Sequence, residues 1–289
     1  MTRRGIKARP AAERKAALLH WLVEKRNPVA LRKARGPFDI VGDVHGCLDE
    51  LLTLMEAMGY RAERVGKEFA VTPPDGRMLA FVGDLVDRGP AAPGVLRLVM
   101  GMARAGTALC IAGNRDAEVV RVLRGGAAQV TRGMARTLDQ LAAEPETFRV
   151  AVLDFLHELP SHLVLDEGRL VIAHAGLKEA LQGRSSAAAR AFALHGDLTG
   201  EKDAVGLPVR RVWAAGYRGK ALVVHGHTPV SAPMWLNNTI NIDTGCAYGG
   251  HLTALRYPER VTLSIPAKAI YYPPRRPFPP NHTLHRARK

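Results

Sequence analysis

Five short polar clusters constrain the fold of this chain more than any other feature of its sequence. Each contains glycine, carries carboxylate, amide or imidazole groups, and lies at the end of an apolar segment of strand length. The clusters are GDVHG (42–46), GDLVDRG (83–89), GNRD (113–116), HAG (174–176) and HGHT (225–228). Ligands of open α/β sheets bind in the crevice beyond the carboxyl ends of the strands. The pattern therefore predicts that the clusters gather at one edge of the sheets.

The segments around the clusters alternate between strand and helix patterns, with glycine and proline between them. Strands are predicted at 38–44, 79–85, 107–113, 221–228, 239–245, 252–258 and 261–266, with a hairpin at 163–176. Helices are predicted at 47–58, 93–105, 116–124 and over most of 128–160, whereas 177–219 has the composition of a loop. This alternation predicts an α/β sandwich in which two mixed sheets face each other with helices outside.

The 289 residues are expected to form one large domain with basic extensions. We expect an N-terminal extension over 1–36 with a short amphipathic helix at 13–26, a domain over 37–267, and a tail rich in proline and arginine over 268–289. Three scattered cysteines suit a reducing cytoplasm rather than a disulfide framework. No secretory signal pattern and no membrane-length apolar segment occur. The sequence thus predicts a cytoplasmic protein without membrane contact and leaves its oligomeric state open.

The formal net charge of +14 makes nucleic acid a candidate partner, because basic proteins neutralise phosphates and release counterions. A solvated surface with basic tails explains the same charge. Aromatic residues make up only 6% of the chain and do not interleave with the basic residues, so composition slightly favours the second explanation. No GxxxxGK[ST] loop is present, so an activity driven by nucleoside triphosphate hydrolysis has no evident site.

The side chains of the clusters are suitable ligands for transition metals such as Mn, Fe, Zn and Co. Flanking glycines let the backbone turn sharply and bring a ligand close to an ion. One such cluster is more often a surface pair or an ordinary hydrogen-bonded histidine. Five clusters at successive strand ends are hard to explain by chance, so the sequence favours a metal site.

The order and spacing of these motifs resemble the calcineurin-like metallophosphoesterases, in the branch of Ser/Thr protein phosphatases and diadenosine tetraphosphatases. A closer resemblance, to the phosphatase domain of bacterial polynucleotide kinase-phosphatases, covers most of residues 38–266. It runs through AGNRDAEVVRVLRG, RLVIAHAGLKEALQGRSSAAARAFALHGDLTGE, LVVHGHTPV and NIDTGCAYGGHLTALRYPERV. The resemblance implies a metallophosphoesterase β-sandwich of two mixed sheets flanked by helices, acting as a hydrolase of phosphate esters.

The resemblance also implies two divalent metal ions, with Mn expected and Fe, Zn, Ni or Co as alternatives. Asp43 and His45 would bind one ion, and Asp84 would bridge both ions. Asn114, His174 and His227 would complete the second ion. Two cations activate a water for attack on phosphorus and neutralise phosphate charge.

The remaining family roles concern the substrate phosphate. Arg88 would clamp phosphate oxygens with its planar fork, and Asn114 would contact the phosphate as well. Asp87 would orient Arg88 or the general acid. Asp243 matches a functional aspartate of the RNA-repair branch and would support the site or contact substrate, with a strand-end turn as the alternative role. His225 is assigned to packing beside the ligands.

The chain departs from the family at one position, because the family pattern Gly-Asn-His-Glu/Asp reads Gly-Asn-Arg-Asp at 113–116. The missing histidine, with the acid beside it (here Asp116), protonates the leaving oxygen. Arg115 cannot release a proton, but it can bind phosphate and stabilise negative charge. A general acid contributes about 10²–10⁴ in rate. We therefore expect weakened activity on poor leaving groups and intact metal binding.

Three hypotheses follow. The first is a phosphoesterase acting on RNA-end or nucleotide phosphates, with Ser/Thr protein phosphatase and dinucleoside tetraphosphatase as alternative activities. The second is a metal-bound, catalytically impaired protein that binds nucleic-acid ends, with Arg115 as an additional phosphate clamp. The third is an inactive variant of an ordinary phosphatase. The sequence leaves all three open.

Overall fold

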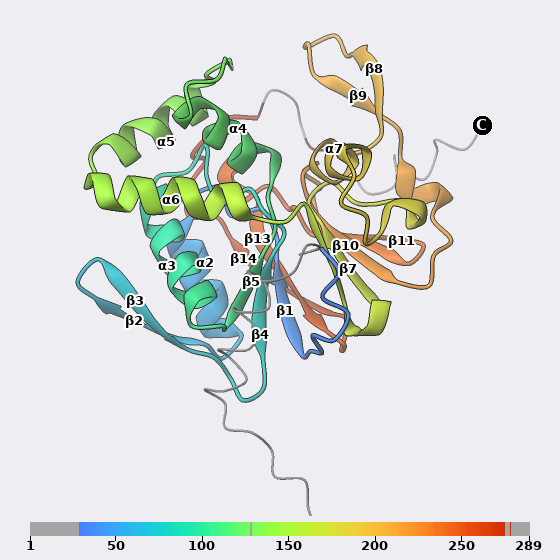
Figure 1. The fold of residues 1–289 in the computed structure, drawn as a ribbon, viewed down its shortest axis with the longest axis horizontal. Coiled ribbons are helices and arrows are strands. Elements are labelled where there is room, and N and C mark those ends of the chain that lie inside the picture. The colour runs from blue at the N-terminus through green and yellow to red at the C-terminus, as the bar shows by residue number, and fades with distance from the viewer. Residues whose placement is uncertain (1–28, 128, 275–277, 279–289) are drawn as a thin grey trace, which may run out of the picture.

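Two five-stranded mixed sheets face each other in the computed structural model, which describes residues 29–127, 129–274 and 278 (Figure 1). The first has the order β14–β13–β1–β4–β5 and the second β11–β12–β10–β7–β6. In each sheet three neighbouring strands run parallel, and every other pair of neighbouring strands is antiparallel. The predicted arrangement of two mixed sheets is thereby confirmed.

The strands agree closely with the sequence prediction. Those of the first sheet are β1 (Phe38–Val41), β4 (Met78–Phe81), β5 (Ala108–Cys110), β13 (His251–Tyr257) and β14 (Val261–Pro266). Those of the second are β6 (His162–Leu165), β7 (Leu170–Ala173), β10 (Leu222–His225), β11 (Met234–Leu236) and β12 (Thr239–Asn241). Several end three or four residues earlier than predicted, because their last predicted residues form turns, most of which carry the polar clusters.

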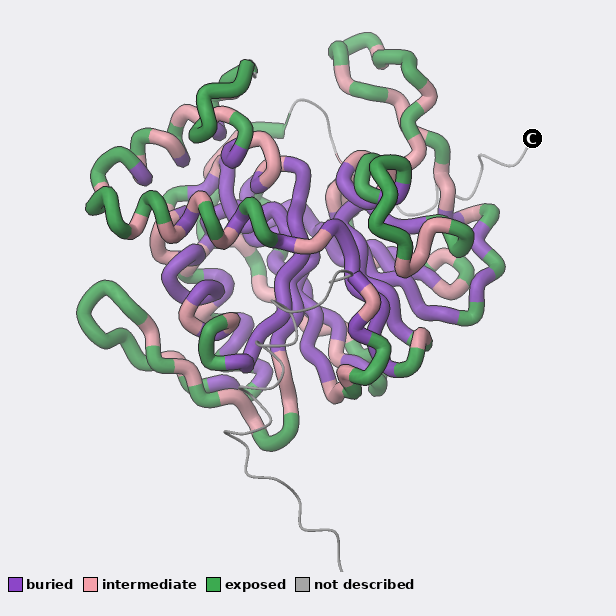
Figure 2. Tube along the Cα trace, in the orientation of Figure 1, coloured by how far each residue is buried: buried purple, intermediate pink, exposed green. Residues whose placement is uncertain are grey.

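Apolar side chains from both sheets fill the space between them. Ile40 and Leu109 of the first sheet lie in one buried cluster with Ile172 and Val224 of the second. Side chains alternate across a strand, so the intervening residues face outward, toward the helices. Figure 2 shows this buried layer running through the centre of the molecule, with exposed residues concentrated in the peripheral helices and hairpins.

Six helices in the described ranges cover the outer faces of the sheets, as predicted. They are α2 (Leu48–Ala57), α3 (Ala92–Arg104), α4 (Asn114–Leu123), α5 (Arg132–Ala142), α6 (Glu146–Glu158) and α7 (Ala187–His195). Residues of α2–α6 share a core cluster with the outer face of the first sheet, and α7 packs against the second. Within the described part of the chain, no helix has the length and apolarity needed to cross a membrane.

Two regions differ from the sequence prediction. The segment 177–219, expected to be loop, contains α7 and a hairpin of β8 (Leu198–Lys202) and β9 (Pro208–Arg210). A second hairpin, β2 (Arg61–Val65) with β3 (Glu68–Thr72), was not anticipated. Both hairpins are rich in charged residues and project from the body, so they lack the apolar alternation by which a half-buried strand is recognised.

Part of the predicted N-terminal extension packs into the domain. The predicted helix at 13–26 lies outside the described residues. Residues that follow it run beside β6, where the Val164 amide donates to the Val29 carbonyl at 2.8 Å. Leu31 is fully buried in the cluster between the sheets. The described residues before β1 therefore contribute to the core of the sandwich.

We expect Leu31→Ala to lower the free energy of unfolding by about 2–5 kcal/mol, because it removes buried methyl groups and leaves a cavity. The matched control is Leu198→Ala on β8, where the leucine is 44% exposed. Urea unfolding of both variants measures the difference. Equal and small losses would show that the segment before β1 is not part of the core.

Candidate metal centre and active site

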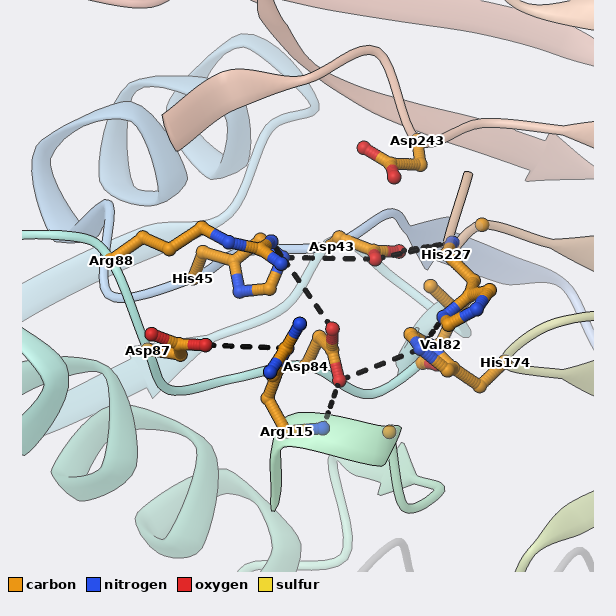
Figure 3. A network of polar contacts seen from close by, with 12 residues as sticks. Asp43, His45, Val82, Asp84, Asp87, Arg88, Arg115, His174, His227 and Asp243 are labelled. Atoms are coloured by element: carbon orange, nitrogen blue, oxygen red, sulfur yellow. Dashed lines mark hydrogen bonds and ion pairs between the residues drawn. The ribbon is translucent and has the colours of Figure 1, made fainter. Parts of the chain in front are cut away.

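The polar clusters meet at the carboxyl ends of the parallel strands, as the sequence predicted. The turns after β1, β4 and β5 carry Asp43, Asp84 and Asn114. The turns after β7 and β10 carry His174 and His227. Figure 3 shows side chains from both sheets pointing toward one another at this edge. The candidate site is thus assembled from two sheets whose strands are far apart in sequence.

Asp84 lies between two groups of potential metal ligands. Its Oδ2 is 3.5 Å from His45 Nε2, which in turn is 3.9 Å from Asp43 Oδ2. Its Oδ1 is 3.5 Å from His174 Nε2. Asp43, His45 and Asp84 are buried, with one ligand atom of each within 4.8 Å of the others. The two oxygens of Asp84 face different groups, an arrangement that fits a bridging ligand.

The second group brings three electron-pair donors into close contact. Asn114 Oδ1 is 3.0 Å from His174 Nε2 and 2.9 Å from His227 Nδ1. The two imidazole nitrogens are themselves 3.0 Å apart. A single proton cannot link all three atoms, whereas one cation between them would satisfy each lone pair.

Hydrogen bonds and burial keep the three histidines of the site neutral, which is the form that binds metal. The Nδ1–H groups of His45 and His174 donate to the carbonyls of Val86 and Val82, at 2.9 and 3.0 Å, which leaves each Nε2 with its lone pair. Burial lowers the pKa of His45 to about 3 and also lowers the pKa of His174 and of His227. Neutral imidazoles with carboxylates and an amide oxygen fit divalent transition-metal ions.

Close packing of two turns fixes the position of Asp84. Its Oδ1 accepts a hydrogen bond from the Arg115 amide at 2.8 Å. A Cβ at Gly83 would lie 2.3 Å from the Gly113 nitrogen, so only glycine permits this approach. Burial by itself would raise the pKa of Asp84, but nearby histidines and arginines outweigh burial and lower it. The carboxylate is therefore ionised at neutral pH.

Backbone strain is concentrated in this site. Of the nine non-glycine residues with positive φ in the described ranges, five lie in the polar clusters. The five are His45, Asp84, Asp87, Arg88 and His227. The left-handed conformation costs about 1–2 kcal/mol for each such residue, and it persists where surrounding structure enforces it. Strain of this kind is typical of sites that position functional groups.

Arg115 occupies the space beside Asp87. Its Nε is 3.3 Å from Asp87 Oδ2, and its Nη1 donates to Glu118 Oε2 at 2.8 Å. Asp87 therefore orients the arginine that stands in place of the family histidine. The Arg115 side chain is 25% exposed, so the guanidinium is accessible to a phosphate group.

Arg88 approaches the first group of ligands from the other side. Its guanidinium contacts the His45 ring and lies 4.9 Å from the centre of the Tyr248 ring. Tyr248 was not predicted as a site residue, because this contact joins segments 160 residues apart in the chain. The aromatic face holds the guanidinium by a cation–π interaction.

The two other predicted acids lie at the margin of the site. Asp116 is buried, and its oxygens accept hydrogen bonds from the Leu85 and Gly113 amides at 3.0 and 2.9 Å. This geometry makes it a positioning residue that ties two ligand-bearing turns together. Asp243 accepts from the Gly245 amide at 3.0 Å and lies near Asp43, apart from the polar network of Figure 3. Burial raises the pKa of Asp243 to about 7.

A sandwich of two mixed sheets with these polar turns at one edge defines a metal-dependent phosphoesterase. The chain belongs to the calcineurin-like phosphoesterase family, whose sequence model matches residues 36–231. It is therefore a hydrolase of phosphoester substrates.

The chain is similar to several named relatives. It is 44% identical over 246 residues to bis(5'-nucleosyl)-tetraphosphatase PrpE, asymmetrical type, of Anoxybacillus flavithermus, covering 83% of this chain and 99% of the relative. It is 40% identical over 238 residues to the Bacillus subtilis protein of the same name, covering 81% and 96%. A protein serine/threonine phosphatase of Saccharomyces cerevisiae shares the fold, with a TM-score of 0.56, 13% identity and coverage of 91% and 92%. The predicted closeness to kinase-phosphatases stays a prediction.

We expect Asp84→Ala to lose both metal ions, because each carboxylate oxygen faces one group of ligands. Elemental analysis after loading with Mn²⁺ should find about two ions per chain in the wild type and close to none in the variant. Asp75→Ala, in an exposed turn, serves as the control and should retain both. Two ions in a folded Asp84→Ala variant would rule out the bridging role.

Proposed function

We propose that the protein hydrolyses nucleoside polyphosphates, with bis(5'-nucleosyl) tetraphosphates as substrates, using two divalent metal ions. The observation that carries the metal assignment is the convergence of ligand atoms on both sides of Asp84. The substrate assignment is supported by the relatives, which are named asymmetrical bis(5'-nucleosyl)-tetraphosphatases and match along nearly their whole length. Manganese remains our choice of metal, with the other transition metals as alternatives.

In this proposal the ions supply an activated water and neutralise phosphate charge. Asp43, His45 and Asp84 would bind one ion, and Asn114, His174 and His227 would complete the second around the shared Asp84. The family of the chain and the neutral state of the buried histidines support this division.

Two arginines would bind the phosphate that is attacked. Arg88 reaches the first group of ligands and is steadied by Tyr248, so its fork can hold oxygens of the phosphate. Arg115 is held by Asp87 and Glu118 and would face the leaving side of the phosphate. A guanidinium there stabilises developing negative charge without transferring a proton.

The absence of a proton donor at position 115 favours an anhydride substrate. When a polyphosphate is cleaved, the departing group is a phosphate oxygen that carries negative charge without protonation. A ribose or serine alkoxide is far more basic and needs an acid to leave. The site therefore suits nucleoside polyphosphates better than RNA 3'-phosphates or phosphoserine. An inactive chain would need disruption elsewhere, since all six proposed ligand positions are occupied by suitable side chains.

Two earlier expectations remain proposals of lower weight. Nucleic acid as a partner rests on the net charge of +14 alone. A cytoplasmic location is supported by the three cysteines, which are buried and form no disulfide.

Incubation with diadenosine tetraphosphate and Mn²⁺ tests the proposed activity directly. Asymmetrical cleavage yields one nucleoside triphosphate and one nucleoside monophosphate in equal amounts, which chromatography separates. We expect both products from the wild type and neither from Asp84→Ala. Hydrolysis of nitrophenyl phosphate without any cleavage of the dinucleotide would contradict the substrate assignment and leave the phosphoesterase assignment intact.

Arg115→His should raise the rate on an alkyl phosphate by about 10²–10⁴, because histidine can protonate an alkoxide leaving group. The rate on diadenosine tetraphosphate and nitrophenyl phosphate should change far less, since their leaving groups need no proton. Arg121→His, on the same helix, is the control. Equal acceleration of all three substrates, or of none, would show that Arg115 does not occupy the position of the general acid.

A further inference from the structure

A cavity of about 420 Å³ lies beside the candidate metal centre. Its lining includes residues 208–214, which cover β9 and the segment after it, and residues 225–228 at the end of β10 and in the turn that follows. Figure 1 shows α7 and the β8–β9 hairpin close together beside the second sheet. Pockets for small molecules have volumes of about 300–1,000 Å³. The cavity thus has room for a nucleoside but is too small for a folded segment.

The cavity is continuous with the metal centre through His227. This residue lines the cavity, while its Nδ1 lies within 3.0 Å of the other second-group ligands. Its amide nitrogen is 3.2 Å from Asp43 Oδ2, so the same turn contacts the first group. The buried Nε2 of His227 has no hydrogen-bond partner within the described residues. A molecule in the cavity would therefore lie directly beside the proposed metal ligands.

A fixed aromatic ring lines the cavity. The Trp213 indole packs edge-to-face against Phe192 and Tyr217, with ring centres 6.1 and 5.9 Å away, and lies 5.3 Å from the His225 ring. A Cβ at Gly176 would lie 2.0 Å from this indole, so the ring also packs on the turn that follows His174. Trp213 remains partly exposed in spite of these contacts. A rigid, accessible indole is a suitable stacking surface for a nucleobase.

Both basic and acidic side chains line the cavity, two arginines together with Asp197 and Asp203, and the arginines are suited to contact a phosphate chain. Arg210 and Arg211 both line the cavity, and the Arg210 Nε is oriented by the His195 carbonyl at 2.9 Å. Arg210 lines the same cavity as the proposed metal ligand His227. Asp197 at the rim is paired with Lys178 at 2.7 Å and with Arg211 at 3.6 Å. Basic groups thus extend from the cavity toward the metal centre.

We propose that this cavity binds the nucleoside of a nucleoside polyphosphate, with the base stacked on Trp213 and the phosphate chain passing Arg210 toward the metal centre. This inference rests on the proposed function and assigns the part of the site that distinguishes nucleotides from other phosphates. It makes Trp213 and Arg210 specificity residues of the substrate-binding surface.

Equilibrium binding separates the nucleoside contribution from that of the phosphates. Calorimetry on the full chain with Mn²⁺ would compare α,β-methylene-ADP with methylenediphosphonate, two non-hydrolysable ligands that share the same bridging group. In the wild type the nucleotide should bind about 5- to 100-fold more tightly, the range expected for one stacked base. Trp213→Leu should abolish most of this preference, whereas Trp213→Phe should keep it.

Trp235→Leu is the matched control, because Trp235 is 37% exposed on β11 and lies outside the cavity. It should leave both dissociation constants unchanged. Met234→Phe, which fills the cavity from another wall, should weaken only the nucleotide and gives a second route if Trp213→Leu does not fold. Equal affinities for the two ligands in the wild type, or equal loss of both in a folded Trp213→Leu variant, would overturn the nucleoside subsite. Because the readout is binding, these results are independent of whether diadenosine tetraphosphate is cleaved.

Discussion

In the proposed metal centre Asp84 serves two groups of ligands at once, and this requirement ties the two sheets together. Its Oδ2 faces His45 on a turn of the first sheet, and its Oδ1 faces His174 on a turn of the second. The carboxyl ends of the parallel strands of both sheets must therefore meet at one edge with a precise spacing. The apolar layer between the sheets supplies that precision, because close-packed side chains fix the spacing of the strands.

The same edge concentrates features that would destabilise a protein without a ligand. Acceptor atoms approach within 3.0 Å of one another, and five non-glycine residues hold left-handed backbone. Bound metal ions would make the close approach of these acceptor atoms favourable, and the strained turns orient the ligand side chains. In the proposed function, the arginines and the Trp213 cavity would together select a substrate with several phosphates and a flat base. The chemistry of Arg115 points to the same class of substrate, since an anhydride leaves without a proton.

The sequence predicted those parts of the fold that depend on local sequence patterns. Apolar segments of strand length predicted the strands of both sheets. The glycine-flanked acids and histidines at their ends predicted which side chains the structure brings together. The hairpins and α7 were missed, because charged, projecting strands and a short alanine-rich helix lack a strong apolar period. Tyr248 and Trp213 were missed for another reason. Their roles depend on contacts between distant segments, and nothing in their sequence neighbours marks them.

The central claim is that Asp84 bridges two metal ions at the edge where the sheets meet. Anomalous X-ray diffraction from crystals soaked in Mn²⁺ tests it most directly. The account predicts two anomalous peaks about 3.5–4 Å apart, one beside Asp43 and His45 and the other beside His174 and His227, with the Asp84 carboxylate between them. A single peak, or two peaks of which neither touches Asp84, would contradict it.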